Sequence, residues 1–194
     1  MGRWLALAGA VLLAIGPASA ATPTAEAPEA DVEVVCAQFG LFEIDAEGRI
    51  LFTPSPTVPL TVGQNFGWVM LLRAKEPVVR WREEFQAPSK PMTWGPMLPG
   101  RTISRDGTTS LMDEYADARG GIITHAWQIT EGDPTGHYMM RVLVGGTSLQ
   151  IFEFEGVPGP TGKVPTPAPG QPVEKAMREC AGAISRAEAP ETSD

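Results

Sequence analysis

Residues 137–154, HYMMRVLVGGTSLQIFEF, are the stretch that decides the fold. Apolar residues recur on both sides of Gly145-Gly146, and both glycines can adopt the positive φ that a type I′ turn requires. The pattern therefore predicts a β-hairpin with a two-residue turn, in which Val142 faces Leu149. Because both faces of this hairpin carry apolar side chains, we expect it inside a packed sheet and not at a free edge.

The upstream sequence continues the β pattern. The segment VVRWREEF alternates most clearly, with Val79, Trp81 and Phe85 on one face. Three prolines between residues 54 and 59 are expected to end a strand and to leave an extended connection. Short strands separated by turns predict an all-β, antiparallel sandwich over residues 32–155. The other strands are expected at residues 32–44, 49–53, 64–74, 101–104, 109–115 and 122–130.

The closing hairpin also carries a resemblance to a known family. It follows the pattern G-x-aromatic-x-x-x-V, then Gly, Leu and a final F-x-aromatic. In this chain the pattern is carried by Gly136, Tyr138, Val142, Gly146, Leu149, Phe152 and Phe154. It resembles the closing hairpin of bacterial exported immunoglobulin-like β-sandwich domains of uncharacterised function, and the similar layout extends over residues 66–154. The resemblance implies an immunoglobulin-like sandwich and no particular substrate, because such a fold hosts many functions.

The first 20 residues have the three parts of a signal peptide. Arg3 provides the positive charge, residues 4–15 are apolar, and Ala18-Ser19-Ala20 is a small-x-small cleavage site. The apolar run is too short to span a bilayer. We therefore expect export from a bacterial cell, to the periplasm or the medium, with cleavage after Ala20. Without its signal peptide the chain has about 174 residues and remains acidic, which argues against nucleic acid and anionic membranes as partners.

Other segments lie outside the expected sandwich. Residues 21–31 predict a disordered leader, residues 156–172 a Pro/Gly linker, and residues 189–194 an acidic tail. Residues 173–188 have the pattern of a helix with one apolar face. That face is formed by Val173, Ala176, Met177, Cys180 and Ile184.

The two cysteines, Cys36 and Cys180, predict a disulfide. An even number of cysteines in an exported chain is most simply explained by pairing. The bond would tether the C-terminal helix to the first strand, and the alternative is two free thiols.

Residues 87–100, APSKPMTWGPMLPG, are the best candidate for a binding site. Four prolines and two glycines predict a long irregular loop, and long ordered loops are often functional. Its apolar residues offer a contact surface for a protein partner. These candidate binding residues are Trp94, Met92, Met97 and Leu98. The alternative is that Trp94 folds back as a lid over one open end of the sandwich.

Metal sites have weaker candidates. His125 and His137 are the two histidines, and with nearby acids they could hold zinc or iron, but their spacing matches no ligand motif. The alternative is that both rings simply pack in the fold. Four methionines could suit Cu(I), but they can equally fill gaps in the core. They are Met92, Met97, Met139 and Met140. No metal or cofactor is assigned.

Enzymatic chemistry finds little support in the sequence. There is no G-x-S-x-G motif and no phosphate-binding glycine loop. Acid–base catalysis needs two carboxylates in one cleft. Adjacent acids on a strand point to opposite faces, so they do not form such a pair. We therefore expect the acidic residues to be solvated. The candidates are Asp113, Glu114, Asp117, Glu83 and Glu84.

These observations favour a non-catalytic binding module of the bacterial envelope that contacts a protein partner through residues 87–100. A second hypothesis is a zinc or copper carrier, or a metal-dependent enzyme, that uses His125 and His137. A third is a structural accessory whose C-terminal helix packs on another subunit. The oligomeric state and the identity of the partner stay open.

Overall fold

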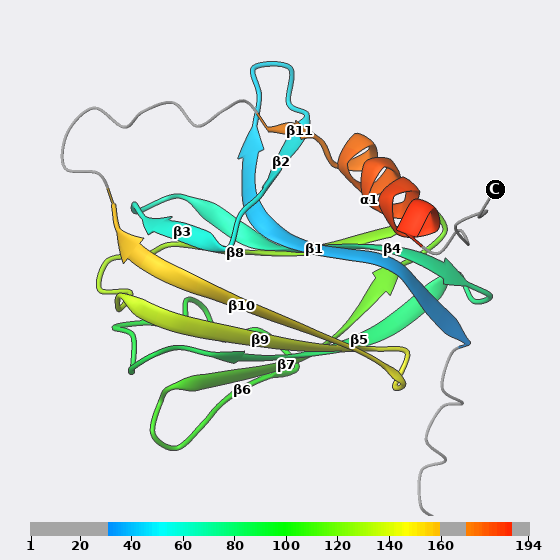
Figure 1. Cartoon of the computed structure of the whole chain (residues 1–194). Coiled ribbons are helices and arrows are strands. Elements are labelled where there is room, and N and C mark those ends of the chain that lie inside the picture. The colour runs from blue at the N-terminus through cyan, green and yellow to red at the C-terminus, as the bar shows by residue number, and fades with distance from the viewer. Residues whose placement is uncertain (1–30, 160–169, 188–194) are drawn as a thin grey trace, which may run out of the picture.

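Two β-sheets packed face to face, with a helix on the outer face of one, form the protein (Figure 1). The computed structural model describes residues 31–159 and 170–187. Sheet A has the order β11 (Gln171–Pro172), β2 (Ile50–Pro54), β1 (Val32–Ile44), β4 (Asn65–Ala74), β8 (Ile122–Gln128). Sheet B has the order β3 (Thr57–Leu60), β10 (Ser148–Pro158), β9 (Gly136–Val144), β5 (Val78–Gln86), β7 (Thr109–Asp117), β6 (Arg101–Ile103). The helix is α1 (Val173–Ala187). The predicted all-β sandwich is thus confirmed.

The closing hairpin, β9 and β10, lies inside sheet B between β5 and β3, as expected. Its register differs from the prediction by one residue, because Val142 pairs with Gln150 and not with Leu149. The loop contains three residues, 145–147, and both of its glycines have positive φ, 61° and 82°. A shift of one residue exchanges the two faces of a strand, and Leu149 is accordingly exposed.

The proline-rich segment after β2 is more regular than expected. Residues 57–60 form β3, which pairs in parallel with the end of β10 at the edge of sheet B. An edge strand tolerates proline, because the position without an N–H group can face away from the neighbouring strand. The ordered strands also extend into the region expected as a linker, since β10 continues to Pro158 and β11 pairs with β2. The predicted signal peptide, most of the leader, residues 160–169 of the linker, residue 188 and the acidic tail lie outside the described residues.

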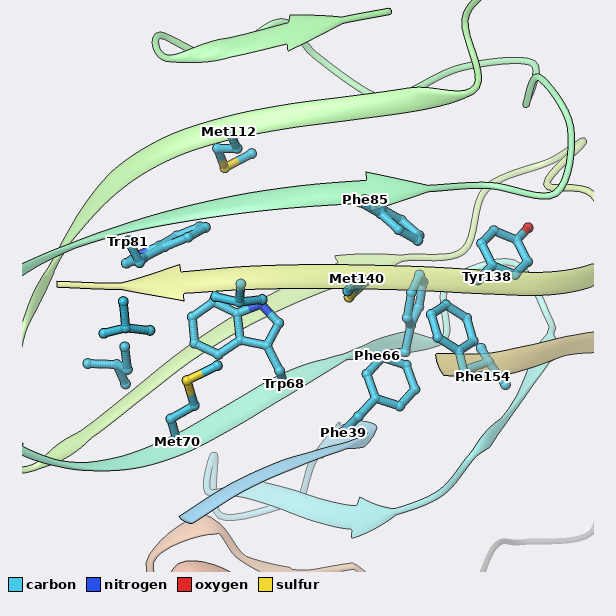
Figure 2. Packing of buried hydrophobic residues seen from close by; sticks show 14 of the residues in the cluster. Phe39, Phe66, Trp68, Met70, Trp81, Phe85, Met112, Tyr138, Met140 and Phe154 are labelled. Carbon is cyan, nitrogen blue, oxygen red and sulfur yellow. The ribbon is translucent and has the colours of Figure 1, made fainter. Parts of the chain in front are cut away.

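The main core fills the space between the sheets and is rich in aromatic rings (Figure 2). Trp68 is completely buried and meets Trp81 edge to face, with ring centroids 5.2 Å apart. Phe154 stacks on Phe39 at 4.4 Å and on Tyr138 at 4.9 Å. Such pairs add about 0.5–1.5 kcal/mol each beyond the burial of their area. The Trp68–Trp81 and Phe39–Phe154 pairs each join a strand of sheet A to a strand of sheet B, so this packing holds the two sheets together.

Helix α1 covers the outer face of sheet A, where it contacts β1, β2 and β4 (Figure 1). The predicted disulfide is confirmed: Cys36 of β1 is bonded to Cys180 of α1, 144 residues away in sequence. The buried residues beneath the helix form a second core. They are Cys36, Phe42, Phe52, Val69, Val173, Ala176 and Met177. One face of β4 packs against the main core and the other against this second core. This explains why the strand is apolar on both faces. No helix within the described residues is long and apolar enough to cross a membrane.

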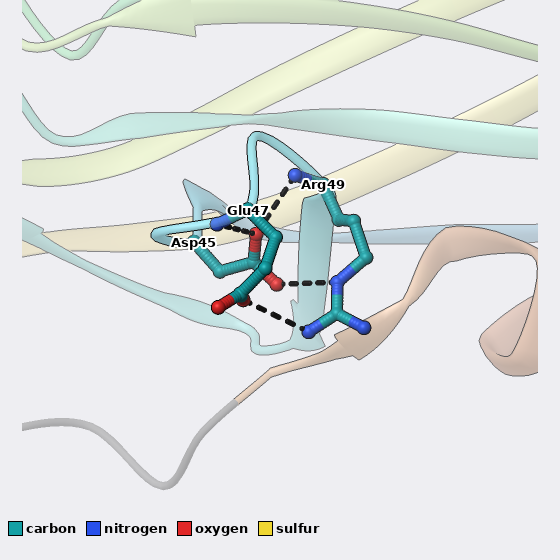
Figure 3. A network of polar contacts seen from close by, with 3 residues as sticks. All are labelled: Asp45, Glu47 and Arg49. Carbon is teal, nitrogen blue, oxygen red and sulfur yellow. Dashed lines mark hydrogen bonds and ion pairs between the residues drawn. The ribbon is translucent and has the colours of Figure 1, made fainter.

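The turn between β1 and β2 is held by a small polar network (Figure 3). One carboxylate oxygen of Asp45 accepts hydrogen bonds from the backbone N–H groups of Glu47 (3.0 Å) and Arg49 (2.8 Å). The other oxygen accepts one from Nε of Arg49 at 2.7 Å. The backbone hydrogen bond from Arg49 contributes most to lowering the pKa of Asp45 below its usual value. These hydrogen bonds all lie within residues 45–49, so local contacts stabilise the turn.

Candidate binding site

A cavity of about 270 Å³ lies between the sheets beneath the loop of residues 87–100. Residues of β4, β5, β8, β9 and β10 line it together with that loop, so both sheets contribute to its walls. Six aromatic rings dominate the lining. They are Phe66, Phe85, Trp94, Trp127, Tyr138 and Phe154. Four of these residues, Phe66, Phe85, Tyr138 and Phe154, gather at one end of the core in Figure 2. The cavity is larger than the apolar cavity of about 150 Å³ that suffices to bind benzene.

Trp94 forms part of the roof of this cavity. Its indole N–H donates a hydrogen bond to the carbonyl of Gly107 at 2.9 Å. Its ring lies edge-on to Phe85 and Trp127, with centroids 5.5 Å and 5.9 Å away. This inward orientation is that of the lid alternative, in which Trp94 covers the open end of the sandwich.

The other three candidate binding residues of the loop are exposed. Met92, Met97 and Leu98 have exposed fractions of 77%, 65% and 42%. Leu98 also lines the cavity, whereas the two methionines do not. Met92 lies against Gly132, which places the loop beside the connection between β8 and β9. Trp94 and the partly exposed Leu98 therefore line the cavity, whereas Met92 and Met97 lie outside its lining.

Glu83 lies beneath the cavity and is the most deeply buried acid described, with 1% of its surface exposed. Its carboxylate accepts hydrogen bonds from the indole N–H groups of Trp68 at 2.6 Å and Trp127 at 2.8 Å. Nδ1 of His125 lies 3.1 Å from the same carboxylate. The expectation that this acid is solvated is wrong. Glu83 occupies the same face of β5 as Trp81, and its burial is possible because three partners satisfy the carboxylate.

Arg101 is the buried cation of the site, with 9% of its surface exposed. One of its terminal nitrogens donates hydrogen bonds to the carbonyls of Trp94 at 2.8 Å and Pro96 at 3.0 Å. Its Cζ lies 4.5 Å from the centroid of the Trp127 ring, a cation–π arrangement. Burial lowers the pKa of Arg101, and the charges of nearby acids oppose that shift. Its Nε has no hydrogen-bond partner in the part of the chain that the structure describes.

The cavity also contains two coupled polar groups, Asp133 and Tyr138. Asp133 accepts hydrogen bonds from the backbone N–H and the hydroxyl of Thr130, at 2.8 Å and 3.4 Å. Burial nevertheless raises the pKa of Asp133. Burial, and then the charge of Asp133, raise the pKa of Tyr138, whose hydroxyl donates to the carbonyl of Pro134. Both groups therefore have partners within the protein.

Comparison with known families identifies the fold. The sequence profile of the family described as PM0630 beta sandwich domain matches residues 37–157. The chain belongs to this family. The match covers more than half of the chain and includes the cavity-lining strands and the loop of residues 87–100. Family membership and the two packed sheets confirm the predicted bacterial β-sandwich domain.

Among solved structures, the PM0630 domain is similar to an immunoglobulin-like protein from Pseudomonas aeruginosa. The two share 17% sequence identity, and the match covers 66% of this chain and 98% of that chain with a TM-score of 0.46. No curated protein matches the chain.

The PM0630 domain keeps its two histidines apart. His125 lies on β8 of sheet A and pairs with Glu83, whereas His137 lies on β9 of sheet B and pairs with Glu155 at 3.0 Å. Within residues 31–159 and 170–187, no three His, Cys, Asp or Glu side chains gather as a metal site. The methionines considered for copper are also divided, since Met140 is buried in the core while Met92 is exposed on the loop.

Two other candidate acids, Asp113 and Asp117, are not among the residues that line the cavity. Asp113 bridges Arg80 and Arg82 on the outer face of sheet B, with its carboxylate 2.9 Å from a terminal nitrogen of each. Asp117 pairs with Arg119 next to it in the following turn. These acids stabilise the surface of sheet B and do not form a pair that faces the cavity.

The sequence analysis expected Glu83 to be solvated and missed Arg101, for different reasons. Glu83 could have been found, because strict alternation along β5 places it between Trp81 and Phe85 on the inward face. Arg101 gives no such signal, since it begins the three-residue strand β6 after an irregular loop. Its burial depends on the folded path of that loop, whose carbonyl groups accept its hydrogen bonds.

Proposed function

We propose that this PM0630-domain protein is a non-catalytic binding module of the bacterial envelope, and that it contacts a protein partner at the loop of residues 87–100. One observation carries this proposal: an aromatic cavity opens beneath the loop, and exposed apolar side chains surround its roof. Cavities that are mainly apolar, with a few polar groups, are the usual form of a binding site. Glu83 is buried and accepts hydrogen bonds from Trp68 and Trp127, which fits a structural role for this carboxylate.

The binding mode follows from the separation between inward and outward residues. Met97 and Met92 are flexible and exposed, so they can adapt to an apolar patch of a partner. Trp94 is held by a hydrogen bond and two ring contacts, so it provides a fixed surface behind them. Fixed aromatic anchors surrounded by adaptable contacts are typical of protein interfaces.

Export to the periplasm or the medium is part of the same proposal. The Cys36–Cys180 disulfide supports it, because structural disulfides persist in oxidising compartments. The signal-peptide pattern of residues 1–20 supports it independently.

Site-specific photo-crosslinking in the native bacterium tests this function. A photoreactive amino acid at Met92 or Met97 is expected to capture a discrete protein partner. The same residue at Ile44 or Val62 serves as the matched control, because these apolar side chains are 71% and 68% exposed. Equal capture at all positions, or capture only at the controls, would contradict the proposed binding surface. Fractionation of the crosslinked cells also tests the proposed compartment.

A further inference from the structure

We propose that the cavity recognises an aromatic ring that carries a carboxylate, with the ring among the aromatic walls and the carboxylate on the guanidinium of Arg101. This inference rests on the proposed function, since it names the chemistry of the group that the same site would accept. Two sources supply that chemistry: the C-terminal aromatic residue of a protein, and a free aryl acid.

The first argument is the unpaired charge of Arg101. A buried arginine is normally paired with an acid, because an isolated charge is costly to remove from water. Within the described residues no carboxylate accepts a hydrogen bond from Arg101, and its observed acceptors are two backbone carbonyls. Glu83 and Glu114 attract it electrostatically, but neither forms an ion pair with it among the described residues, and the carboxylate of Glu83 already accepts from Trp68 and Trp127.

The second argument is the unused donor. Nε of Arg101 is buried and has no partner among the described residues, and Arg101 lines the cavity. A buried N–H group without an acceptor is uncommon and requires an explanation. A guanidinium presents its N–H donors in a fixed fork that matches the two oxygens of a carboxylate. A carboxylate bound against the guanidinium in the cavity would therefore neutralise its charge and offer it an acceptor.

The third argument is the size and chemistry of the space. The volume of about 270 Å³ exceeds the space of about 150 Å³ that holds benzene by roughly four water volumes. That remainder accommodates a short linker and a carboxylate. Phe85, Trp94 and Trp127 meet one another edge to face or at a tilt, an arrangement into which another ring can pack. Trp127 also contacts Arg101, so the aromatic walls adjoin the cation.

Calorimetric titration of the full chain, purified with its disulfide intact, tests the inference. The free-acid probe is 3-phenylpropionate, and 3-phenylpropionamide is its neutral match. The peptide probe is acetyl-Gly-Phe with a free C-terminus, matched by the same peptide with a C-terminal amide. We expect each acid to bind about 10- to 100-fold more tightly than its amide, as hydrogen bonds to charged groups predict. The tighter of the two acids identifies the source.

Variants of Arg101 test the assignment of the carboxylate. Arg101→Lys keeps the charge but loses the fork, and Arg101→Gln loses both, so each is expected to reduce the preference for acid over amide to less than threefold. Arg105→Gln is the matched control, because Arg105 is an exposed arginine after β6 that does not line the cavity. Its preference for the acid is expected to equal that of the wild type.

The comparison of acid with amide on the wild-type protein stands even if an Arg101 variant does not fold. Equal affinity for acid and amide would overturn the inference while leaving the proposed apolar binding site in place. No binding of either probe, or an unchanged preference in folded Arg101→Gln, would also overturn it. Crosslinking at Met92 and Met97 tests the proposed function separately, so the two failures are distinguishable.

Discussion

The two coverings of this sandwich differ in what they bury. Helix α1 covers the outer face of sheet A with apolar side chains and is held there by the Cys36–Cys180 disulfide. The loop of residues 87–100 covers the open space between the sheets, and beneath it lie the buried charges of Glu83 and Arg101. Apolar packing alone is sufficient to hold a helix against a sheet. Buried charges have a desolvation cost that the apolar packing beneath the helix does not have.

The largest expected change in stability comes from removing the disulfide that holds helix α1. Cys36→Ala/Cys180→Ala removes a crosslink between residues 144 apart, and the chain-entropy argument predicts a loss of about 4–5 kcal/mol in the free energy of unfolding. Urea unfolding of the double variant measures it, and the reduced wild type is the control. A loss below about 1 kcal/mol would mean that the helix is held by packing alone.

The second-largest expected change in stability concerns the buried carboxylate of Glu83 beneath the loop. Glu83→Ala leaves the indole N–H groups of Trp68 and Trp127 without their acceptor, and we expect a loss of about 3 kcal/mol. Glu83→Gln keeps one acceptor oxygen and is expected to lose about 1–2 kcal/mol. Glu84→Ala, a half-buried neighbour on the opposite face of β5, is the matched control and should change stability by less than about 0.5 kcal/mol. Equal effects of Glu83→Ala and Glu84→Ala would show that the buried carboxylate is not structurally important.

A third prediction tests whether the helix side is a packed core. Met177 is completely buried against sheet A, so Met177→Ala should leave a cavity and lose about 2–3 kcal/mol. Ile184, 40% exposed near the end of the same helix, provides the control, and Ile184→Ala should lose less than about 1 kcal/mol. Thermal unfolding compares them, and similar losses would indicate that α1 packs only loosely.

The smallest effect is on the dependence of stability on pH. Burial raises the pKa of Asp113, but the hydrogen bonds from Arg82 and Arg80 outweigh it, and the pKa remains below its usual value. A lowered pKa means that the ionised form stabilises the fold above the unfolded pKa of about 3.9, and that this contribution is lost as the pH falls through the folded pKa. The difference in unfolding free energy between the wild type and Asp113→Asn should therefore shrink below about pH 4. If the difference in unfolding free energy grew on acidification, the pKa of Asp113 would be raised by folding and not lowered.

Much of the fold could be predicted from the sequence, because alternation and turn residues are local signals. The alternation in β5 and the two apolar faces of β4 describe the observed strands well. The register of the closing hairpin was wrong because loop length depends on one residue, Thr147. Strand β3 was missed because its parallel pairing with β10 is a non-local contact between segments about 100 residues apart.

The site was less predictable than the fold. Trp94 and Leu98 were identified from the composition of the loop, but the direction in which each side chain points is set by tertiary packing. The alternation along β5 places Glu83 on the inward face, but the donors that satisfy its carboxylate come from two other strands, and no local pattern reveals them. The buried position of the Arg101 guanidinium depends on hydrogen bonds to two backbone carbonyls of the loop, which exist only in the folded protein.

The central claim is that the loop side receives a ligand and the helix side does not. The most direct measurement is a titration of the ¹⁵N-labelled protein with 3-phenylpropionate, followed through the indole N–H signals of Trp94 and Trp127 and the backbone amide signals of α1. The account predicts saturable shifts of both indole signals, with the amide signals of α1 unchanged. Unmoved indole signals at saturating probe, or equal shifts in the helix, would contradict it.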